Sequence, residues 1–262
     1  MLSFVKLGGS LITDKRIEAS FRAEVMARLA QEIQTALVKN PELRLLVGHG
    51  SGSFGHFTAS QYGTVQGVHS SDQWRGFAEV ATVAAELNYL VARELQKARV
   101  PVWRIQPSAS ARCQDGSLRS MEVFPIKTAL EKGLVPLVYG DVALDDVRGG
   151  TIISTEMVFG YLARHLPVNQ IVLFGEVEGV YDERGIVIPR ITPKTLMNFQ
   201  SALTGSAGVD VTGGMLTKVR DMLALVEAVP GLKIRIIDGT QPNLLLQTLL
   251  EQIEPGTLLV GD

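Results

Sequence analysis

The sequence is poor in the side chains that most often build cross-links and zinc sites. Its 262 residues include one cysteine, Cys113, and four histidines, at positions 49, 56, 69 and 165. A single cysteine excludes an internal disulfide bond and a cysteine-based zinc site, and no two histidines have the i,i+4 spacing of zinc ligands on a helix. We therefore expect a protein of a reducing compartment, the cytoplasm, without a protein-held metal centre.

The sequence also lacks an excess of either charge and any long apolar run. Its 25 basic and 27 acidic residues give a net charge of -2, which argues against nucleic acid or an anionic membrane as a partner. No segment approaches the ~20 consecutive apolar residues of a membrane span. The apolar run at residues 1–7 is too short for a secretory signal. Small, multiply charged ligands remain compatible with this composition.

Short apolar runs alternate with longer segments of helical period. In the predicted helix 74–97, one stripe is formed by Phe77, Val80, Ala81, Ala84, Leu87 and Val91. The predicted strands are 3–7, 43–47, 102–105, 135–139, 170–174, 233–237 and 257–260. The predicted helices are 21–38, 74–97, 123–132, 156–165, 215–227 and 243–252. This order is typical of an α/β protein with a mainly parallel sheet and ligand-binding loops at one edge. We expect one domain, 1–262, with a continuous sheet, a hairpin at 179–189 and a flexible loop at 201–210.

A glycine-rich segment, Gly48–His56, follows the second predicted strand. Gly50, Gly52 and Gly55 match the dinucleotide pattern G-x-G-x-x-G, whereas Gly50, Gly55 and His56 match the P-loop pattern with histidine in the place of lysine. Under both readings, glycines without Cβ atoms let backbone N–H groups approach an anion. The segment therefore predicts an anion-binding loop, and the choice between the two patterns stays open.

Lysines accompany glycines at two other strand or helix ends. Lys6 ends the first predicted strand directly before Gly8-Gly9-Ser10, and Lys15 follows nine residues later. In the segment 210–218, a diglycine opens a helix that carries Lys218 in its first turn. Phosphoryl transfer needs cations along the path of the moving group, and these three lysines can supply them.

One acidic residue stands out as a candidate partner for these lysines. Asp141 follows the predicted strand 135–139, where its carboxylate could orient the lysines through charge-assisted hydrogen bonds. Because other metal ligands are lacking, we expect Mg²⁺ to be held mainly by the phosphates of a bound nucleotide.

In content and order, these motifs resemble those of the amino-acid-kinase superfamily. They are Lys6–Ser10, Gly48–His56, Gly140–Asp141, Gly175–Tyr181 and Asp210–Lys218, and they span nearly the whole chain. The resemblance implies a three-layer αβα open sandwich around a mainly parallel sheet of about eight strands. It also implies an acceptor-binding N-terminal part, an ATP-binding C-terminal part and a homodimer. Within the superfamily, the segment ending at His56 looks like that of the isopentenyl phosphate kinases, whose histidine here contacts the acceptor phosphate.

Carried over position by position, the resemblance implies a role for each of these residues. The ATP site comprises Lys6, Gly8, Gly9, Ser10, Gly52, Glu176, Gly214 and Lys218. The acceptor site comprises Ser51, Gly52, Gly55, His56 and Thr155. The predicted catalytic residues are Lys6, Lys15, Asp141 and Lys218. The sequence departs from the family pattern at Ser51, at Ser154–Met157 and at Glu176, where glycine, Ser-Gly-Asp-Asp and aspartate are expected.

The activity that the resemblance implies is in-line transfer of the ATP γ-phosphoryl group to isopentenyl phosphate. A phosphate acceptor is already an anionic nucleophile, so the absence of an obvious catalytic base agrees with this reaction. The alternatives are a fosfomycin kinase or another phosphate or phosphonate kinase of the superfamily, and a non-catalytic nucleotide-binding protein. A dinucleotide-dependent oxidoreductase, with Asp72 on the ribose, would leave Lys6, Lys15 and Lys218 without a role.

Overall fold

A mainly parallel eight-stranded sheet forms the centre of the molecule. The computed structural model describes residues 1–199 and 214–262, so the predicted loop 201–210 and residues 210–213 of the third glycine cluster lie outside the described residues. The strand order is β10-β12-β11-β9-β1-β2-β6-β3, and only the β11–β12 pair is antiparallel. The strands are β1 (Leu2–Leu7), β2 (Arg44–His49), β3 (Val102–Arg104), β6 (Val135–Tyr139), β9 (Gln170–Gly175), β10 (Arg190–Ile191), β11 (Lys233–Asp238) and β12 (Thr257–Leu259).

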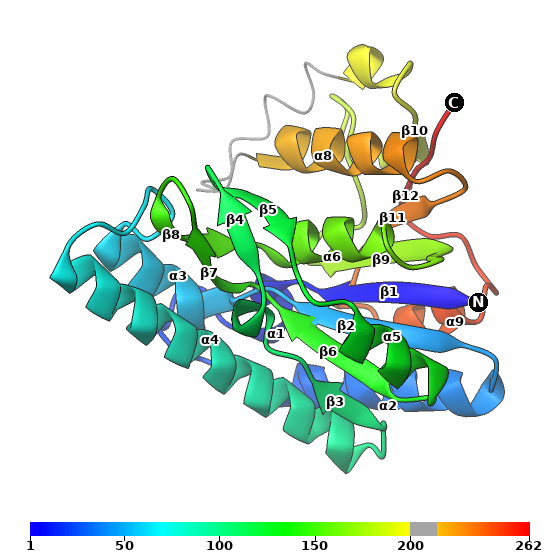
Figure 1. Ribbon diagram of the computed structural model, residues 1–262. Helices are drawn as coiled ribbons and strands as arrows, with labels where there is room; N and C mark the ends of the chain where they lie inside the picture. The colour runs from blue at the N-terminus through cyan, green and yellow to red at the C-terminus, as the bar shows by residue number, and fades with distance from the viewer. Residues whose placement is uncertain (200–213) are drawn as a thin grey trace.

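Helices cover both faces of this sheet, which makes the three predicted layers (Figure 1). One face packs against α2 (Ala23–Lys39), α4 (Ser71–Lys97) and α9 (Leu244–Leu249). The other packs against α5 (Phe124–Glu131), α6 (Thr155–Ala163) and α8 (Gly214–Ala228). Alternate residues of a strand point to opposite faces, so Phe4 lies on the α6 side while Val5 and Leu7 lie on the α2 side.

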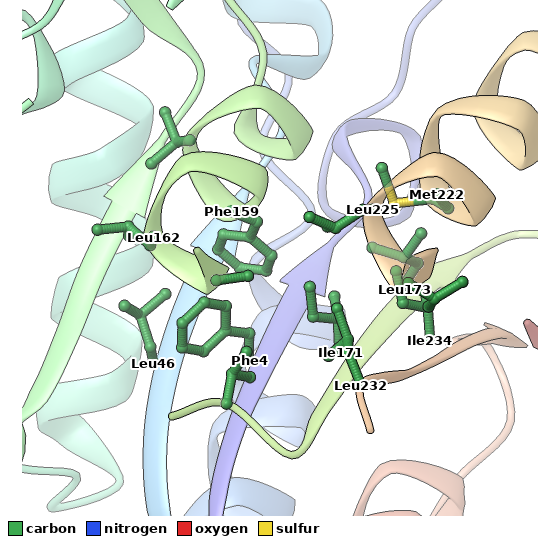
Figure 2. Close-up of a cluster of buried hydrophobic side chains, with 14 of the residues drawn as sticks. Phe4, Leu46, Phe159, Leu162, Ile171, Leu173, Met222, Leu225, Leu232 and Ile234 are labelled. Carbon is green, nitrogen blue, oxygen red and sulfur yellow. The ribbon is translucent and has the colours of Figure 1, made fainter. Parts of the chain in front are cut away.

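The core on the α6 side fixes that helix against the central strands (Figure 2). The rings of Phe4 on β1 and Phe159 on α6 lie 5.2 Å apart at 59°, and Leu46 and Leu162 pack in the same cluster. Burying each of these side chains stabilises the fold by roughly 1.5–3 kcal/mol. As a consequence, the N-terminus of α6 is held near the carboxyl end of β1, which ends at Leu7, three residues beyond Phe4.

The expectation of a single continuous sheet is wrong. A second sheet, in the order β5-β4-β7-β8, is formed by β4 (Arg112–Gln114), β5 (Ser117–Ser120), β7 (Asp141–Asp145) and β8 (Gly149–Ile153). Its turns depend on the buried carboxylate of Asp145, which accepts hydrogen bonds from the backbone N–H groups of Asp115, Gly116, Val147 and Arg148. Burial alone would raise the pKa of Asp145, but these donors hold it below its ordinary value. Short strands anchored by one side chain carry no apolar periodicity, so the sequence did not indicate them.

The predicted helices and strands all form, whereas the short helix at Gly9–Ile12, strand β10 and, as the main exception, a helix at the glycine-rich segment were not predicted. All seven predicted strands lie in the central sheet, and the predicted hairpin contains an antiparallel bridge between Tyr181 and Val187. The exception is α3 (Gly52–Tyr62), where a loop was expected through His56. Because this helix has two glycines in its first turn and no strong apolar stripe, its sequence does not signal a helix. None of the helices in residues 1–199 and 214–262 is long and apolar enough to cross a membrane.

Candidate functional site

The carboxyl ends of β1 and β9 form a topological switch point. The chain leaves β1 toward β2 through α1 (Gly9–Ile12) and α2 on one face, and leaves β9 toward β11 through α8 on the other face. Such opposite crossovers open a crevice at the strand ends, where α/β proteins bind ligands. The N–H group of Gly8 donates to the Phe174 carbonyl across this point at 2.7 Å. The predicted ATP-site residues that end β1 and follow β9 therefore lie at the same switch point.

Two glycine turns, Gly8-Gly9 after β1 and Gly50-Ser51-Gly52 after β2, touch each other at this edge. A Cβ atom on Gly9 would lie 2.5 Å from the Gly52 nitrogen, and one on Gly50 would lie 3.0 Å from the Gly9 nitrogen. Gly52 also has a φ of +50°, a conformation that other residues rarely adopt. The structure therefore requires glycine at these positions because the two backbones approach without room for side chains.

Thr13 joins the two turns. Its hydroxyl donates to the Gly9 carbonyl at 2.7 Å and accepts from the Ser53 N–H group at 2.9 Å. This side chain is fully buried and lies at the end of α1. Thr13 was not predicted as a site residue, since a lone threonine beyond a short turn gives no motif.

Lys6 pairs with Glu156, a residue 150 positions later in the chain. The Lys6 ammonium donates to the Glu156 carboxylate in the first turn of α6. Burial alone would raise the pKa of Glu156, but the hydrogen bond and charge of Lys6, together with the charge of Lys218, keep it below its ordinary value. The two lysines predicted to flank the transferring group therefore converge on one ionised carboxylate.

Asp141 does not take the role that the sequence suggested. It is buried at the start of β7, where its carboxylate accepts from the backbone N–H groups of Ser108 at 3.1 Å and Val142 at 2.8 Å. Burial raises the pKa of Asp141, although these hydrogen bonds act in the opposite direction. The carboxylate that pairs with Lys6 is instead Glu156, because packing of α6 on β1 brings its first turn to the strand end.

Thr155 lies beside the Gly50-Ser51-Gly52 turn, at the N-terminus of α6. Its buried hydroxyl donates to the His49 carbonyl at 2.5 Å, and Ser154 caps the helix by accepting from the Met157 N–H group at 3.1 Å. The helix dipoles of α3 and α6 thus present positive ends at Gly52 and Thr155 on the same edge. This geometry favours an anion between them.

The remaining predicted residues lie around this edge in different settings. Gly55 is buried in α3, and the exposed His56 follows it on the same helix. Lys15 is exposed in the segment closed by the Thr13–Phe21 bridge. Glu176 follows β9 and forms a 2.8 Å ion pair with Arg22. Gly214 and Lys218 lie in the first turns of α8.

Backbone donors at this edge complete an anion-binding surface. The N–H group of Ser51 makes no hydrogen bond within residues 1–199 and 214–262. The first N–H groups of a helix have no partner within it, which applies to Gly9 and Ser10 in α1 and to Gly52 in α3. Together with the ammonium groups of Lys6 and Lys218, these donors suit two phosphate groups held side by side.

The dinucleotide interpretation of the glycine pattern finds no support in this geometry. Asp72, the candidate ribose ligand, lies exposed in the first turn of α4. In dinucleotide sites the acidic residue ends a neighbouring strand of the sheet, next to the glycine turn. No group of three histidine, cysteine, aspartate or glutamate side chains able to hold a metal occurs in the part of the chain that the structure describes.

Comparison with known proteins agrees with this chemistry. Residues 1–238 match the model of the amino acid kinase family. The chain is 31% identical over 260 residues to the isopentenyl phosphate kinase of Methanocaldococcus jannaschii, with 97% of each chain covered. It is 37% identical over 225 residues to that of Haloferax volcanii, covering 86% of this chain and 88% of the relative. A solved structure of isopentenyl phosphate kinase is similar with a TM-score of 0.84 and 27% identity, over 99% of this chain and 100% of the other.

Proposed function

This chain belongs to the amino acid kinase family, and we propose that it transfers the γ-phosphoryl group of ATP to isopentenyl phosphate. The products are isopentenyl diphosphate and ADP. The observation that carries the proposal is the contact between the two glycine turns, where Gly9 and Gly52 leave no room for a Cβ atom between two anion-binding surfaces. Transfer of a phosphoryl group from one phosphate to another requires two phosphate sites that are directly adjacent.

On the donor side, the proposed ATP contacts are Lys6, the Gly8–Ser10 turn, Gly52, Glu176, Gly214 and Lys218. Lys6 is anchored by Glu156 near the end of β1, two residues before the Gly8–Ser10 turn. In this position it would stabilise the charge that develops on the γ-phosphoryl oxygens. The backbone N–H groups and ammonium groups among these contacts suit phosphate oxygens, which accept hydrogen bonds. Mg²⁺ would be held mainly by those oxygens and would neutralise part of their charge.

On the acceptor side, the proposed contacts are Ser51, Gly52, Gly55, His56 and Thr155. The positive ends of α3 and α6 and the Ser51 N–H group would bind the phosphate of the acceptor. His56 would donate from its ring N–H to a phosphate oxygen. Lys15, exposed on the adjacent segment, would approach the same anion from solvent.

The proposed reaction needs no proton transfer from the acceptor. A phosphate oxygen of isopentenyl phosphate attacks the γ-phosphorus, a new P–O bond forms, and the bond to the bridging oxygen of ADP breaks, leaving its electron pair on ADP. The role of the protein is to place the two phosphates in line and to stabilise the charge as it moves. Asp141 stays buried behind the site and would support it only through the backbone of Ser108 and Val142.

A single screen distinguishes this reaction from its alternatives. ATP consumption is measured with isopentenyl phosphate, dimethylallyl phosphate, geranyl phosphate, fosfomycin, acetylglutamate and UMP. We expect clear preference for the first two acceptors. Preference for fosfomycin would favour the phosphonate kinase, and no turnover with any acceptor would favour a nucleotide-binding protein without this activity.

We propose a homodimer in the cytoplasm that serves isoprenoid synthesis, since the family resemblance implies the dimer and the single cysteine agrees with a reducing compartment. Light scattering during size-exclusion chromatography measures the mass of the particle in solution. A monomer across the micromolar range would contradict the dimer.

A further inference from the structure

His49, the last residue of β2, is a fully buried histidine that the reaction does not use directly. Its Nδ1 atom lies 3.0 Å from the Gly50 carbonyl, and its Nε2 atom lies 3.1 Å from the Asn88 side-chain amide. The ring stacks on Tyr139 at 5.7 Å, nearly parallel. Both ring nitrogens therefore have fixed partners, and the ring lies directly before the Gly50-Ser51-Gly52 turn in the chain.

The partners determine which ring nitrogen carries the proton. Arg104, which can only donate, donates from Nε to the Asn88 Oδ1 atom at 3.0 Å. The Asn88 amide nitrogen therefore faces His49 and donates to Nε2, which leaves Nδ1 to carry the proton and donate to the Gly50 carbonyl. Burial, the main cause, lowers the pKa of His49 to about 4, so the ring is neutral near pH 7, as this arrangement requires.

The orientation of the Gly50 carbonyl sets the direction of the next N–H group. In a trans peptide unit, the C=O of one residue and the N–H of the following residue point in opposite directions. His49 holds the Gly50 carbonyl toward the protein interior, so the Ser51 N–H group points away from it. That N–H group makes no hydrogen bond within the described residues, which suits a donor reserved for a ligand.

We propose that Arg104, Asn88 and His49 form a directed chain of hydrogen-bond donors that fixes the Gly50–Ser51 peptide and aims its N–H group at the acceptor phosphate. The chain begins on β3 and crosses α4 before it reaches the turn after β2. His49 is thus a positioning residue for the acceptor, whereas the ATP contacts of the Gly8–Ser10 turn do not depend on it. This inference rests on the proposed function, because it assigns the Ser51 donor to the acceptor phosphate.

Two substitutions separate the bond to Gly50 from the bond to Asn88. In His49→Asn, the amide nitrogen can take the place of Nδ1 and keep the bond to the Gly50 carbonyl while the bond to Asn88 is lost. In His49→Gln, the longer side chain can reach Asn88, but the donor to Gly50 is lost. Each variant breaks one hydrogen bond of the same buried side chain, so the two variants should lose similar amounts of unfolding free energy.

Steady-state kinetics with both substrates test the proposal. We expect His49→Gln to raise the acceptor KM by about tenfold while the KM for ATP changes by less than about twofold. We expect His49→Asn to keep the acceptor KM within about threefold of wild type. Equal changes in the two variants, or equal changes in both substrates, would show a merely structural role and overturn the proposal.

Nitrogen NMR of the wild-type protein gives an independent readout. Selective ¹⁵N labelling of histidine should show a protonated Nδ1 and an unprotonated Nε2 for His49 at neutral pH, and the opposite tautomer would overturn the chain. If the acceptor screen shows that wild type prefers another phosphate or phosphonate, the proposed function fails. The same variant pair, assayed with that acceptor, still tests the role of His49.

Discussion

Replacing Gly9 with alanine should separate the two glycine turns of the site. The new Cβ atom would lie 2.5 Å from the Gly52 nitrogen and 2.7 Å from its Cα atom, whereas an ordinary contact begins at 3.4 Å. The atoms that it meets belong to the backbone, so no side chain can rotate away. The turns must therefore move apart by about 0.9 Å at their closest approach.

A displacement of this size predicts a large loss of activity. Misplacing reacting groups by ~1 Å costs on the order of 10²-fold in rate, because in-line transfer depends on the separation and alignment of the two phosphates. We expect kcat/KM to fall by about this factor. Overpacking of a close contact destabilises a fold by roughly 1–3 kcal/mol, so Gly9→Ala should still fold.

The assay is kcat/KM with the preferred acceptor, together with the midpoint of urea unfolding. Gly160→Ala on α6 is the matched control, since a Cβ there would lie 3.4 Å from the end of the flexible Arg164 side chain. Alanine also favours a helix over glycine by up to ~1 kcal/mol, so this control should be as active and as stable as wild type or more so. Activity of Gly9→Ala within threefold of wild type would refute the argument from the contact between the turns.

Three further substitutions test separate parts of the site. His56→Ala should raise the acceptor KM by roughly tenfold or more with little change in ATP affinity, and an equal loss of ATP binding would contradict the role of His56. Lys218→Ala should lower kcat by about 10²-fold, and unchanged turnover would remove Lys218 from the transfer path. Glu156→Gln should lower the free energy of unfolding at pH 7 by about 1–3 kcal/mol, as denaturant titration can measure. Because the folded pKa of Glu156 lies below its ordinary value of 4.5, this difference should be complete above that pH and should shrink as the pH falls through the folded pKa. A difference that does not depend on pH would exclude the ion pair with Lys6 as its cause.

The fold was predictable where the signal was periodic. Seven strands of the central sheet follow from short apolar runs, and helix α4 follows from its stripe of apolar residues. The second sheet and α3 could not be predicted, because Asp145 and the packing of glycines decide them rather than local pattern. Residue type indicated the glycines that meet at the carboxyl ends of β1 and β2, and the parallel sheet explains why these two turns are neighbours.

The partners within the site could not be predicted in the same way. Asp141 seemed the natural partner for the lysines because it follows a strand, yet Glu156 pairs with Lys6 and Asp141 binds backbone N–H groups. The role of Thr13 was equally hidden, since its two partners, Gly9 and Ser53, lie on different turns.

The sequence by itself determined the chemistry that is available: glycines that expose backbone donors and lysines at the ends of buried segments. Only the tertiary structure decided which of these groups meet. Gly9 touches Gly52, Lys6 meets Glu156, and Asn88 fixes the proton on His49, all across separations of 39 to 150 residues. Such contacts depend on strand order and on which face each helix covers, and the periodicity of a local segment carries no information about either.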